Sequence, residues 1–192
     1  MAALVIDSHG TIADDLGKIA PVDPKLFLDP AEFLLADHNR QRNLWRLLET
    51  VAVEPHSTDR RTRAEVVLNY LVHDLIWHVE DEELQVFPRL RERMPPGDGT
   101  ADMLTLLERD HRGDRRLAEE LLEPLDRLIA GVTPHEPVEF AARARVIVEL
   151  QRRHLAWENA LVIPQAWRLL NSADKVELGR KMARRRAMAF PR

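Results

Sequence analysis

The chain has 192 residues, 45% of them hydrophobic and 31% charged, so it is long enough to fold as one globular domain with a core. Its net charge of −4 with neutral histidines gives no general attraction for nucleic acid or for an anionic membrane. The absence of cysteine excludes disulfides, thiolate zinc sites and iron–sulfur clusters, so any metal would need nitrogen and oxygen ligands.

Residues 1–29 show no sustained helical period, and we expect an extended N-terminal arm in which His9 is solvated. This segment has neither the basic region nor the long apolar stretch of a secretory signal. No part of the chain approaches the roughly 18 unbroken apolar residues that cross a bilayer. A cytoplasmic location is therefore expected.

The rest of the chain is rich in Leu, Ala, Glu and Arg, which are strong helix formers, and it predicts an all-α fold. Asp29 followed by Pro30 marks the start of the first helix, because aspartate caps a first turn and proline is favoured at its first position. The turn EPHST at 54–58 ends this helix and offers Ser57 or Thr58 as the next N-cap.

The second helix is predicted over about residues 59–94, and the segment PPGDG at 95–99 ends it. The third helix begins near Thr100. A kink is expected at Pro124, because proline cannot donate a helical hydrogen bond, and Gly131 is a plausible end signal.

The fourth helix follows the turn TPHEP at 133–137, and a short last helix, capped by Ser172, ends in the basic segment RKMARRR. Short connections favour antiparallel neighbours. The sequence therefore predicts an up-down-up-down antiparallel four-helix bundle over residues 30–170, with the arm before it and a basic C-terminal helix within residues 171–192.

One motif, His-x3-Glu-x5-Pro, occurs twice, in WHVEDEELQVFP at 77–88 and in RHLAWENALVIP at 153–164. The predicted first and third helices also resemble each other, since ADHNRQRNL around His38 and RDHRGDRRL around His111 share Asp-His, an arginine and a leucine at the same spacing. The chain thus looks like two copies of one helical hairpin.

The spacing of four histidines tests this interpretation. Residues at the same height in an antiparallel hairpin lie equally far from its turn, because each helix rises by about 1.5 Å per residue. The midpoints between successive histidines fall near residues 58, 94 and 132, at or close to the three predicted turns. We therefore expect one histidine per helix at a common level of the bundle, at His38, His78, His111 and His154.

These histidines lie on the apolar stripes of their helices, with Glu82 and Glu158 one turn further along the same stripes. Buried carboxylates are costly unless they are paired or coordinate a metal. Carboxylates can bridge two cations while imidazoles fill terminal positions, and this ligand set suits iron, manganese or zinc. The alternative to a metal site is a hydrogen-bonded polar core without metal.

The order His, His-x3-Glu, His, His-x3-Glu over roughly residues 30–165 resembles the hemerythrin-like, HHE cation-binding domain family. This resemblance implies a non-haem di-iron centre in a four-helix bundle, with two histidines on each iron and both glutamates as bridges. Family members bind dioxygen, react with peroxide or nitric oxide, or sense iron and oxygen. The implied ligands are His38 and His78 for one iron, His111 and His154 for the other, and Glu82 and Glu158 between them.

One departure from the oxygen-carrying members concerns the third helix, where Arg115 stands in place of a second histidine, and the fourth-helix acid, Glu158, follows its histidine by four residues and not five. The resemblance then implies a more symmetric centre with at least one position left for water, a borrowed carboxylate or a substrate. Asp114 and Glu108 are candidate extra ligands.

Other polar and aromatic residues can be interpreted as either structural or functional. His73 is expected to pack beside another element, and His56 and His135 to be solvated in turns. The basic segment RKMARRR is expected to suit the helix dipole and water rather than nucleic acid. The tryptophans are expected to pack the bundle, with an electron path or a gate as the alternative. The repeated arginines either orient a carboxylate or lie exposed. These residues are Trp45, Trp77, Trp157 and Trp167, and Arg42 and Arg115.

The predicted function is that of a hemerythrin-type di-iron protein that binds or reacts with dioxygen, hydrogen peroxide or nitric oxide. The alternatives are an iron- or oxygen-sensing regulatory domain without turnover and a metal-free interaction module. No nucleic acid or membrane partner is expected, and a homodimer is left open. Whether the chain is a carrier, an enzyme or a sensor is not determined by these residues.

Overall fold

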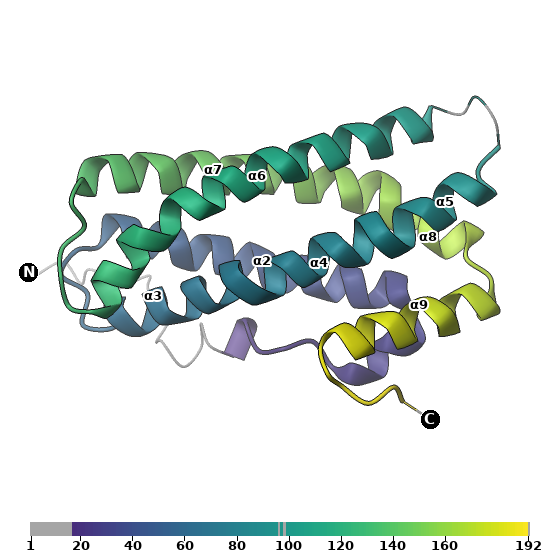
Figure 1. Ribbon diagram of the computed structural model, residues 1–192, viewed down its shortest axis with the longest axis horizontal. Helices are drawn as coiled ribbons and strands as arrows, with labels where there is room; N and C mark the ends of the chain where they lie inside the picture. Colours follow the sequence, from purple (N-terminus) through teal and green to yellow (C-terminus); the bar gives the residue numbers. More distant parts are fainter. Residues whose placement is uncertain (1–16, 96, 98, 192) are drawn as a thin grey trace, which may run out of the picture.

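The computed structural model describes residues 17–95, 97 and 99–191, and within them the chain forms helices and no strand (Figure 1). This confirms the all-α class. No helix in the described part is both long and apolar enough to cross a membrane. The first long segment is α2 (Pro30–Val53). The second is a continuous run of α3 (Arg60–Asn69), η2 (Tyr70–Asp74), α4 (Leu75–Asp81), η3 (Glu82–Val86) and α5 (Phe87–Arg93). The third is α6 (Thr100–Ile129), and the fourth is a run of α7 (Pro137–Trp157), η4 (Glu158–Val162) and α8 (Ile163–Leu169).

The long segments lie side by side around two apolar clusters. α2 packs against α3 and α7, and α6 packs against the same two helices. One cluster contains Trp45, Tyr70 and Leu121, and the other contains Phe33, Phe87 and Leu104. On α2, on α6 and on the run from α3 to α5, the predicted histidine falls between the residues of one cluster and those of the other. On α7, His154 lies directly before Leu155, the last residue of the first cluster on that segment. The fold therefore provides a polar layer between two apolar cores.

Both His-x3-Glu-x5-Pro motifs end in a widened helical turn. η3 and η4 are π-helical turns that begin at Glu82 and Glu158, and in each the closing N–H bonds the carbonyl of that glutamate, five residues back. The prolines one residue later, Pro88 and Pro164, have no N–H to give and would clash with a carbonyl four residues back in a regular helix. The repeated proline thus accompanies a local widening that starts at each site glutamate.

Several predicted helix boundaries are confirmed. The side chain of Asp29 accepts a hydrogen bond from the N–H of Ala31 at the start of α2. Gly131 has a φ of 74°, its N–H bonds the carbonyl of Leu128, and the N–H of Val132 bonds that of Arg127. This pattern satisfies the last carbonyls of α6 and explains why a glycine follows it.

Two predicted caps are wrong by one or two residues. α3 begins after Asp59 and not after Ser57 or Thr58, because the carbonyl of Ser57 is used in a turn with the N–H of Arg60. α9 (Ser172–Arg185) is capped by Asn171, whose side chain accepts from the N–H of Asp174. α6 continues through Pro124 without ending there.

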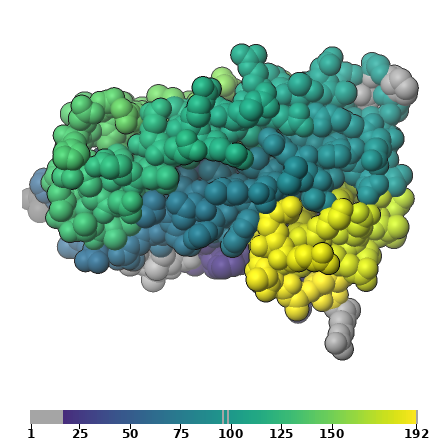
Figure 2. Space-filling view, in the orientation of Figure 1, coloured from purple at the N-terminus to yellow at the C-terminus, as the bar shows by residue number. Residues whose placement is uncertain are grey.

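The described part of the predicted arm is not fully extended, because residues Pro24–Leu28 form the 3-10 helix η1. η1 packs against α9, and Phe27 is completely buried there. A Cβ atom on Gly179 would collide with the backbone carbonyl of Phe27, so this close approach requires glycine. Figure 2 shows α9 lying on the surface of the earlier segments. His9 lies outside the described residues, and the division into arm, bundle and tail stays a prediction.

Candidate metal centre

The six residues singled out by spacing come together in the polar layer. Each comes from one of the long segments, and none has more than 5% of its surface exposed. They are His38 on α2, His78 on α4, Glu82 at the start of η3, His111 on α6, His154 on α7 and Glu158 at the start of η4.

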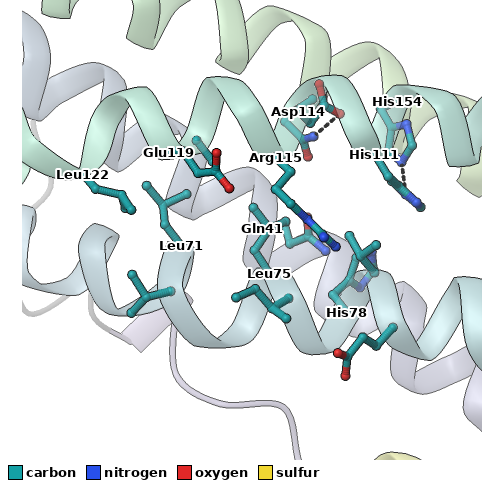
Figure 3. Close-up of a pocket in the computed structure, with 16 residues that line it drawn as sticks. Gln41, Leu71, Leu75, His78, His111, Asp114, Arg115, Glu119, Leu122 and His154 are labelled. Atoms are coloured by element: carbon teal, nitrogen blue, oxygen red, sulfur yellow. Dashed lines mark hydrogen bonds between the residues drawn. The ribbon is translucent and has the colours of Figure 1, made fainter.

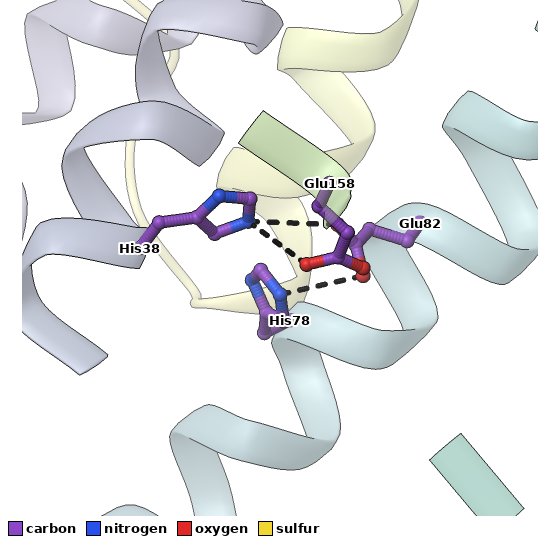
Figure 4. A group of neighbouring side chains, drawn as sticks. All are labelled: His38, His78, Glu82 and Glu158. Carbon is purple, nitrogen blue, oxygen red and sulfur yellow. Dashed lines mark ion pairs between the residues drawn. The ribbon is translucent and has the colours of Figure 1, made fainter. Parts of the chain in front are cut away.

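The side chains form two groups that share both glutamates. One group is His38, His78, Glu82 and Glu158, and Figure 4 shows His78 and Glu82 on one continuous helical segment, with His38 and Glu158 reaching them from other segments. The second group consists of the same two glutamates with His111 and His154. Within each group the candidate ligand atoms lie within 4.8 Å of one another.

The ring nitrogens face the carboxylates. In the first group, His38 Nε2 lies 3.5 Å from Glu158 Oε2 and 3.7 Å from Glu82 Oε1. His78 Nε2 lies 3.3 Å from Glu82 Oε2. In the second group, His154 Nε2 lies 2.8 Å from Glu158 Oε1, and His111 Nε2 lies 3.4 Å from Glu82 Oε2.

These atoms fit a pair of metal ions. Both carboxylate oxygens of Glu82 and of Glu158, and Nε2 of His38, are buried and make no hydrogen bond of good geometry, although the carboxylates and the imidazole nitrogens face one another. Such groups are costly in an apolar interior. The Nε2 atoms of His111 and His154 are 2.9 Å apart. Two nitrogens bound at right angles to one ion, at about 2.1 Å each, would be separated by roughly that distance.

Three of the four histidines are oriented through their other ring nitrogen. His38 Nδ1 donates to Asn159 Oδ1 at 2.8 Å, and His111 Nδ1 donates to Glu83 Oε1 at 2.9 Å. His78 Nδ1 lies 3.0 Å from Asp37 Oδ2. Such contacts hold the ring so that its Nε2 lone pair faces the centre.

Sequence reasoning did not identify these orienting partners, although a signal for two of them is present. Glu83 and Asn159 each directly follow a glutamate of the repeated motif, and each contacts a histidine of the other hairpin. The two halves therefore support each other's histidines. Within the described residues, the buried Nδ1 of His154 has no such partner.

The ionisable groups are strongly coupled. Burial and the charge of Glu82 act to raise the pKa of Glu158, but the nearby histidines outweigh them and lower it to about 2. Burial acts to lower the pKa of His78, yet Glu82 and Asp37 raise it well above 6.5. The carboxylates thus favour protons on the imidazoles of His78 and His111, and metal ions bound to these nitrogens would take the place of those protons.

The candidate extra ligands do not join the two groups. Asp114 is buried and accepts a hydrogen bond from Gln151 Nε2 at 2.7 Å. Glu108 pairs with Arg91 at 2.7 Å. Of the repeated arginines, Arg42 donates to Asn39, whereas Arg115 lines a pocket beside the centre.

The predictions for the remaining residues have mixed outcomes. Trp45 packs in the core, edge-on to Tyr70, as predicted. Trp157 and Trp167 are 55% and 41% exposed, so the prediction that they pack inside the bundle is wrong. His73 is exposed and stacks on Trp77 of its own segment. The turn histidines, His56 and His135, are exposed as predicted.

The expectation that the basic tail faces water is wrong for two of its arginines. Arg185 and Arg186 both pair with Asp81, which is completely buried next to Glu82. Arg186 also lies over the ring of Phe33, 4.8 Å from its centre. The reason is tertiary: α9 folds back onto α2 and α4, so its last turn meets a buried carboxylate.

Comparison with family models identifies one match. The model described as the hemerythrin HHE cation binding domain matches residues 29–166. Comparisons with curated proteins and with solved structures found no match.

Proposed function

Because the chain belongs to the hemerythrin HHE cation-binding domain family, we propose that it is a non-haem di-iron protein that binds or reacts with a small oxidant. The candidate oxidants are dioxygen, hydrogen peroxide and nitric oxide. Manganese or zinc could use the same nitrogen and oxygen donors. A cytoplasmic location and a homodimer stay predictions.

The observation that carries the proposal is the pair of four-residue groups with two glutamates in common. In this assignment His38 and His78 hold one iron and His111 and His154 hold the other. Glu82 and Glu158 would be shared by the two ions, whose charge would compensate two completely buried carboxylates.

The surrounding residues would orient the ligands and exclude water. Phe87 stacks on the ring of His111 with their centres 6.1 Å apart, and the apolar clusters close the layer from both ends. Asp37, Glu83 and Asn159 fix the histidine rings. When bound, iron would supply the redox chemistry toward the oxidant, and Arg115, which takes the place of a further histidine, leaves room for that ligand.

We also interpret the bundle as up-down-up-down. Figure 1 supports this order, because successive long segments begin at the end where the preceding one stops. The contacts of α2 with α3 and α7, and of α6 with the same helices, fit a square arrangement of four neighbours.

A sensor without turnover is the second candidate. The observation that favours it is the contact of α9 with Asp81, the residue directly before Glu82. Binding or loss of a metal ion at Glu82 would alter the contact between Asp81 and α9. A partner protein could then recognise the changed position of that helix.

Metal analysis of variants tests the two-metal assignment. The protein loaded with ferrous iron without oxygen should hold two irons per chain. Glu82→Ala should lose both, because this glutamate belongs to both groups, whereas His38→Ala should retain about one. His56→Ala, which alters an exposed turn histidine, is the control and should retain two.

Exposure of the loaded protein to air or peroxide then separates the two functions. Repeated consumption of oxidant that is lost in His111→Ala supports the reactive centre. Stoichiometric oxidation without turnover, together with release of α9 detected by proteolysis, supports the sensor. A wild-type chain that binds no iron would exclude both.

A further inference from the structure

A pocket of about 400 Å³ adjoins the candidate metal centre (Figure 3). His78, His111 and His154 line one part of it. Leu71 and Leu122 lie toward the other end, and Arg115 extends toward the end where His78 lies. The pocket therefore joins the histidines of both groups to an apolar space.

One wall of the pocket is built by the run from α3 to α4, which includes η2. The π-helical turn η2, which contains Leu71 and Val72, has no proline to cause it, and the N–H of Leu75 bonds the carbonyl of Tyr70, five residues back. α3 packs closely on α6 before this turn, whereas α4 after it does not. The space left between α4 and α6 is thus part of the backbone geometry and does not depend on one side-chain rotamer.

The size of the pocket exceeds what a small oxidant needs. Dioxygen or hydrogen peroxide takes up little more room than water, whose share of liquid volume is about 30 Å³. Pockets of 300–1,000 Å³ with mostly apolar walls are typical of sites for organic molecules. The walls of this one include Leu71, Leu75, Ile76, Ala118 and Leu122. An organic body of several carbons would bury these surfaces.

The polar groups that line the pocket would complement a ligand whose head group both donates and accepts hydrogen bonds. Oε1 of Gln41, a residue with 0% exposure, is an acceptor without a partner. Arg115 makes no ion pair with any residue in the described part and can donate. Of the acids that line the pocket, Glu80 and Asp114 are already held, by Arg185 and Gln151 respectively, and Glu119 has an exposed side chain.

We propose that this pocket binds an organic hydroperoxide, with its O–O–H group between Gln41 and Arg115 and its apolar body along Leu71, Leu75 and Leu122. The hydroxyl end donates to Gln41 Oε1, and the peroxide oxygens accept from the guanidinium of Arg115. This inference rests on the proposed function in one respect, which is that the head faces the dimetal centre. It narrows the oxidant class from any small peroxide to one with an apolar body.

Binding of linear alkyl hydroperoxides to the zinc-loaded protein tests the inference, because zinc does not turn them over. Isothermal titration calorimetry with the butyl, hexyl and octyl compounds should show one saturable site. Affinity should rise about fourfold for each added methylene until the pocket is full. Hydrogen peroxide should show no saturable binding in the same range.

Matched variants locate the site. Ala118→Phe, which fills the pocket, should weaken octyl hydroperoxide binding at least tenfold, and Leu122→Trp is a second filling variant if the first does not fold. Arg115→Gln should weaken binding about tenfold through loss of a charged donor. Arg112→Gln alters an exposed arginine on the same helix that does not line the pocket, and it should have no effect.

Each of the following results would overturn the inference: affinity independent of chain length, binding unchanged in both folded filling variants, or octanoate binding more tightly than octyl hydroperoxide. The last would identify an anion site. A chain that holds two zinc ions but no hydroperoxide would overturn this inference alone. A chain that takes up no metal would overturn the proposed function, and hydroperoxide binding to that metal-free chain would still support the pocket assignment.

Discussion

Asp37 tests how far a single residue outside the ligand set controls the centre. Burial acts to raise the pKa of Asp37, but His78 and Arg40 lower it to about 2, so a carboxylate faces His78 Nδ1 at neutral pH. Asp37→Asn removes that charge. Because such partners orient a ligand and increase its basicity, we expect metal affinity to fall 10- to 100-fold, measured by competition with a chromophoric chelator.

Asp110→Asn is the control for this variant. Asp110 occupies the equivalent place before His111 in the repeat, but its carboxylate makes no hydrogen bond or ion pair with a site histidine. Its substitution should leave affinity unchanged. Equal losses in both variants would mean that overall charge, and not the contact with His78, controls binding.

The six clustered residues were predictable because spacing alone determines which helix face they occupy and at what height. Their orienting partners were not. Glu83 and Asn159 follow the site glutamates, a position that would point elsewhere in a regular helix, and both lie in π-helical turns. Sequence periodicity at 3.6 residues per turn does not describe those turns, so the side-chain directions required the structure.

At the scale of elements, α9 is attached through a buried carboxylate. Asp81 is fully buried, and Arg185 and Arg186 supply its two charged partners. Replacing both by methionine keeps the apolar stems but leaves the carboxylate uncompensated. We expect the free energy of unfolding to fall by about 3–5 kcal/mol, measured by urea denaturation.

Arg184→Met is the control, because Arg184 is exposed in the same turn. It should change stability by less than about 0.5 kcal/mol. Adding Asp81→Asn to the double variant should recover part of the loss, since the buried charge is then gone. A double variant as stable as the control would show that Asp81 finds water or another partner.

The start of α9 gives a pH-dependent prediction. Burial acts to raise the pKa of Asp174, but Arg93, the backbone N–H of Asn171 and Arg89 outweigh it and hold the pKa below 3.8. A depressed pKa stabilises the fold above the unfolded value, and this contribution is lost as pH falls through the folded value. Asp174→Asn should therefore cost about 1 kcal/mol at pH 7 and progressively less below pH ~4.

Urea denaturation of both proteins between pH 2.5 and pH 7 measures this difference. Asp102→Asn, in the exposed first turn of α6, alters an aspartate without the arginine partners and should cost less than Asp174→Asn at pH 7. A constant difference across the range would mean that Asp174 acts through shape and not through its charge.

Element positions were predictable where one local signal dominates, as at Asp29 and Gly131. The cap of α9 was missed because Asn171 and Ser172 are both good caps, and only the reciprocal bond between Asn171 and Asp174 decides between them. The place of the tail helix was missed for another reason. Its partner, Asp81, is about a hundred residues away, and no local pattern encodes that contact.

At the scale of the whole molecule, the candidate centre is a polar layer that joins the long segments between two apolar clusters. The two groups draw ligands from α2, from α4 and η3, from α6, and from α7 and η4. Ions bound there would connect all four segments, so metal should contribute to global stability and not only to local order.

Metal removal tests this coupling. Ligands that bind only the folded state stabilise it by about 4 kcal/mol per site at a thousandfold excess over Kd. For a chain of this size that corresponds to a rise in Tm of roughly 8–16 °C for each occupied site. Calorimetry of the loaded protein, before and after a strong chelator, should show this shift.

Glu82→Gln should lose nearly all of the metal-dependent rise in Tm, since Glu82 belongs to both groups. Glu65→Gln, a substitution of an exposed residue on α3, should retain that rise. Chelated and loaded wild-type proteins that melt within 2 °C of each other would mean that the layer is stable without ions and that the two groups do not act as a metal site.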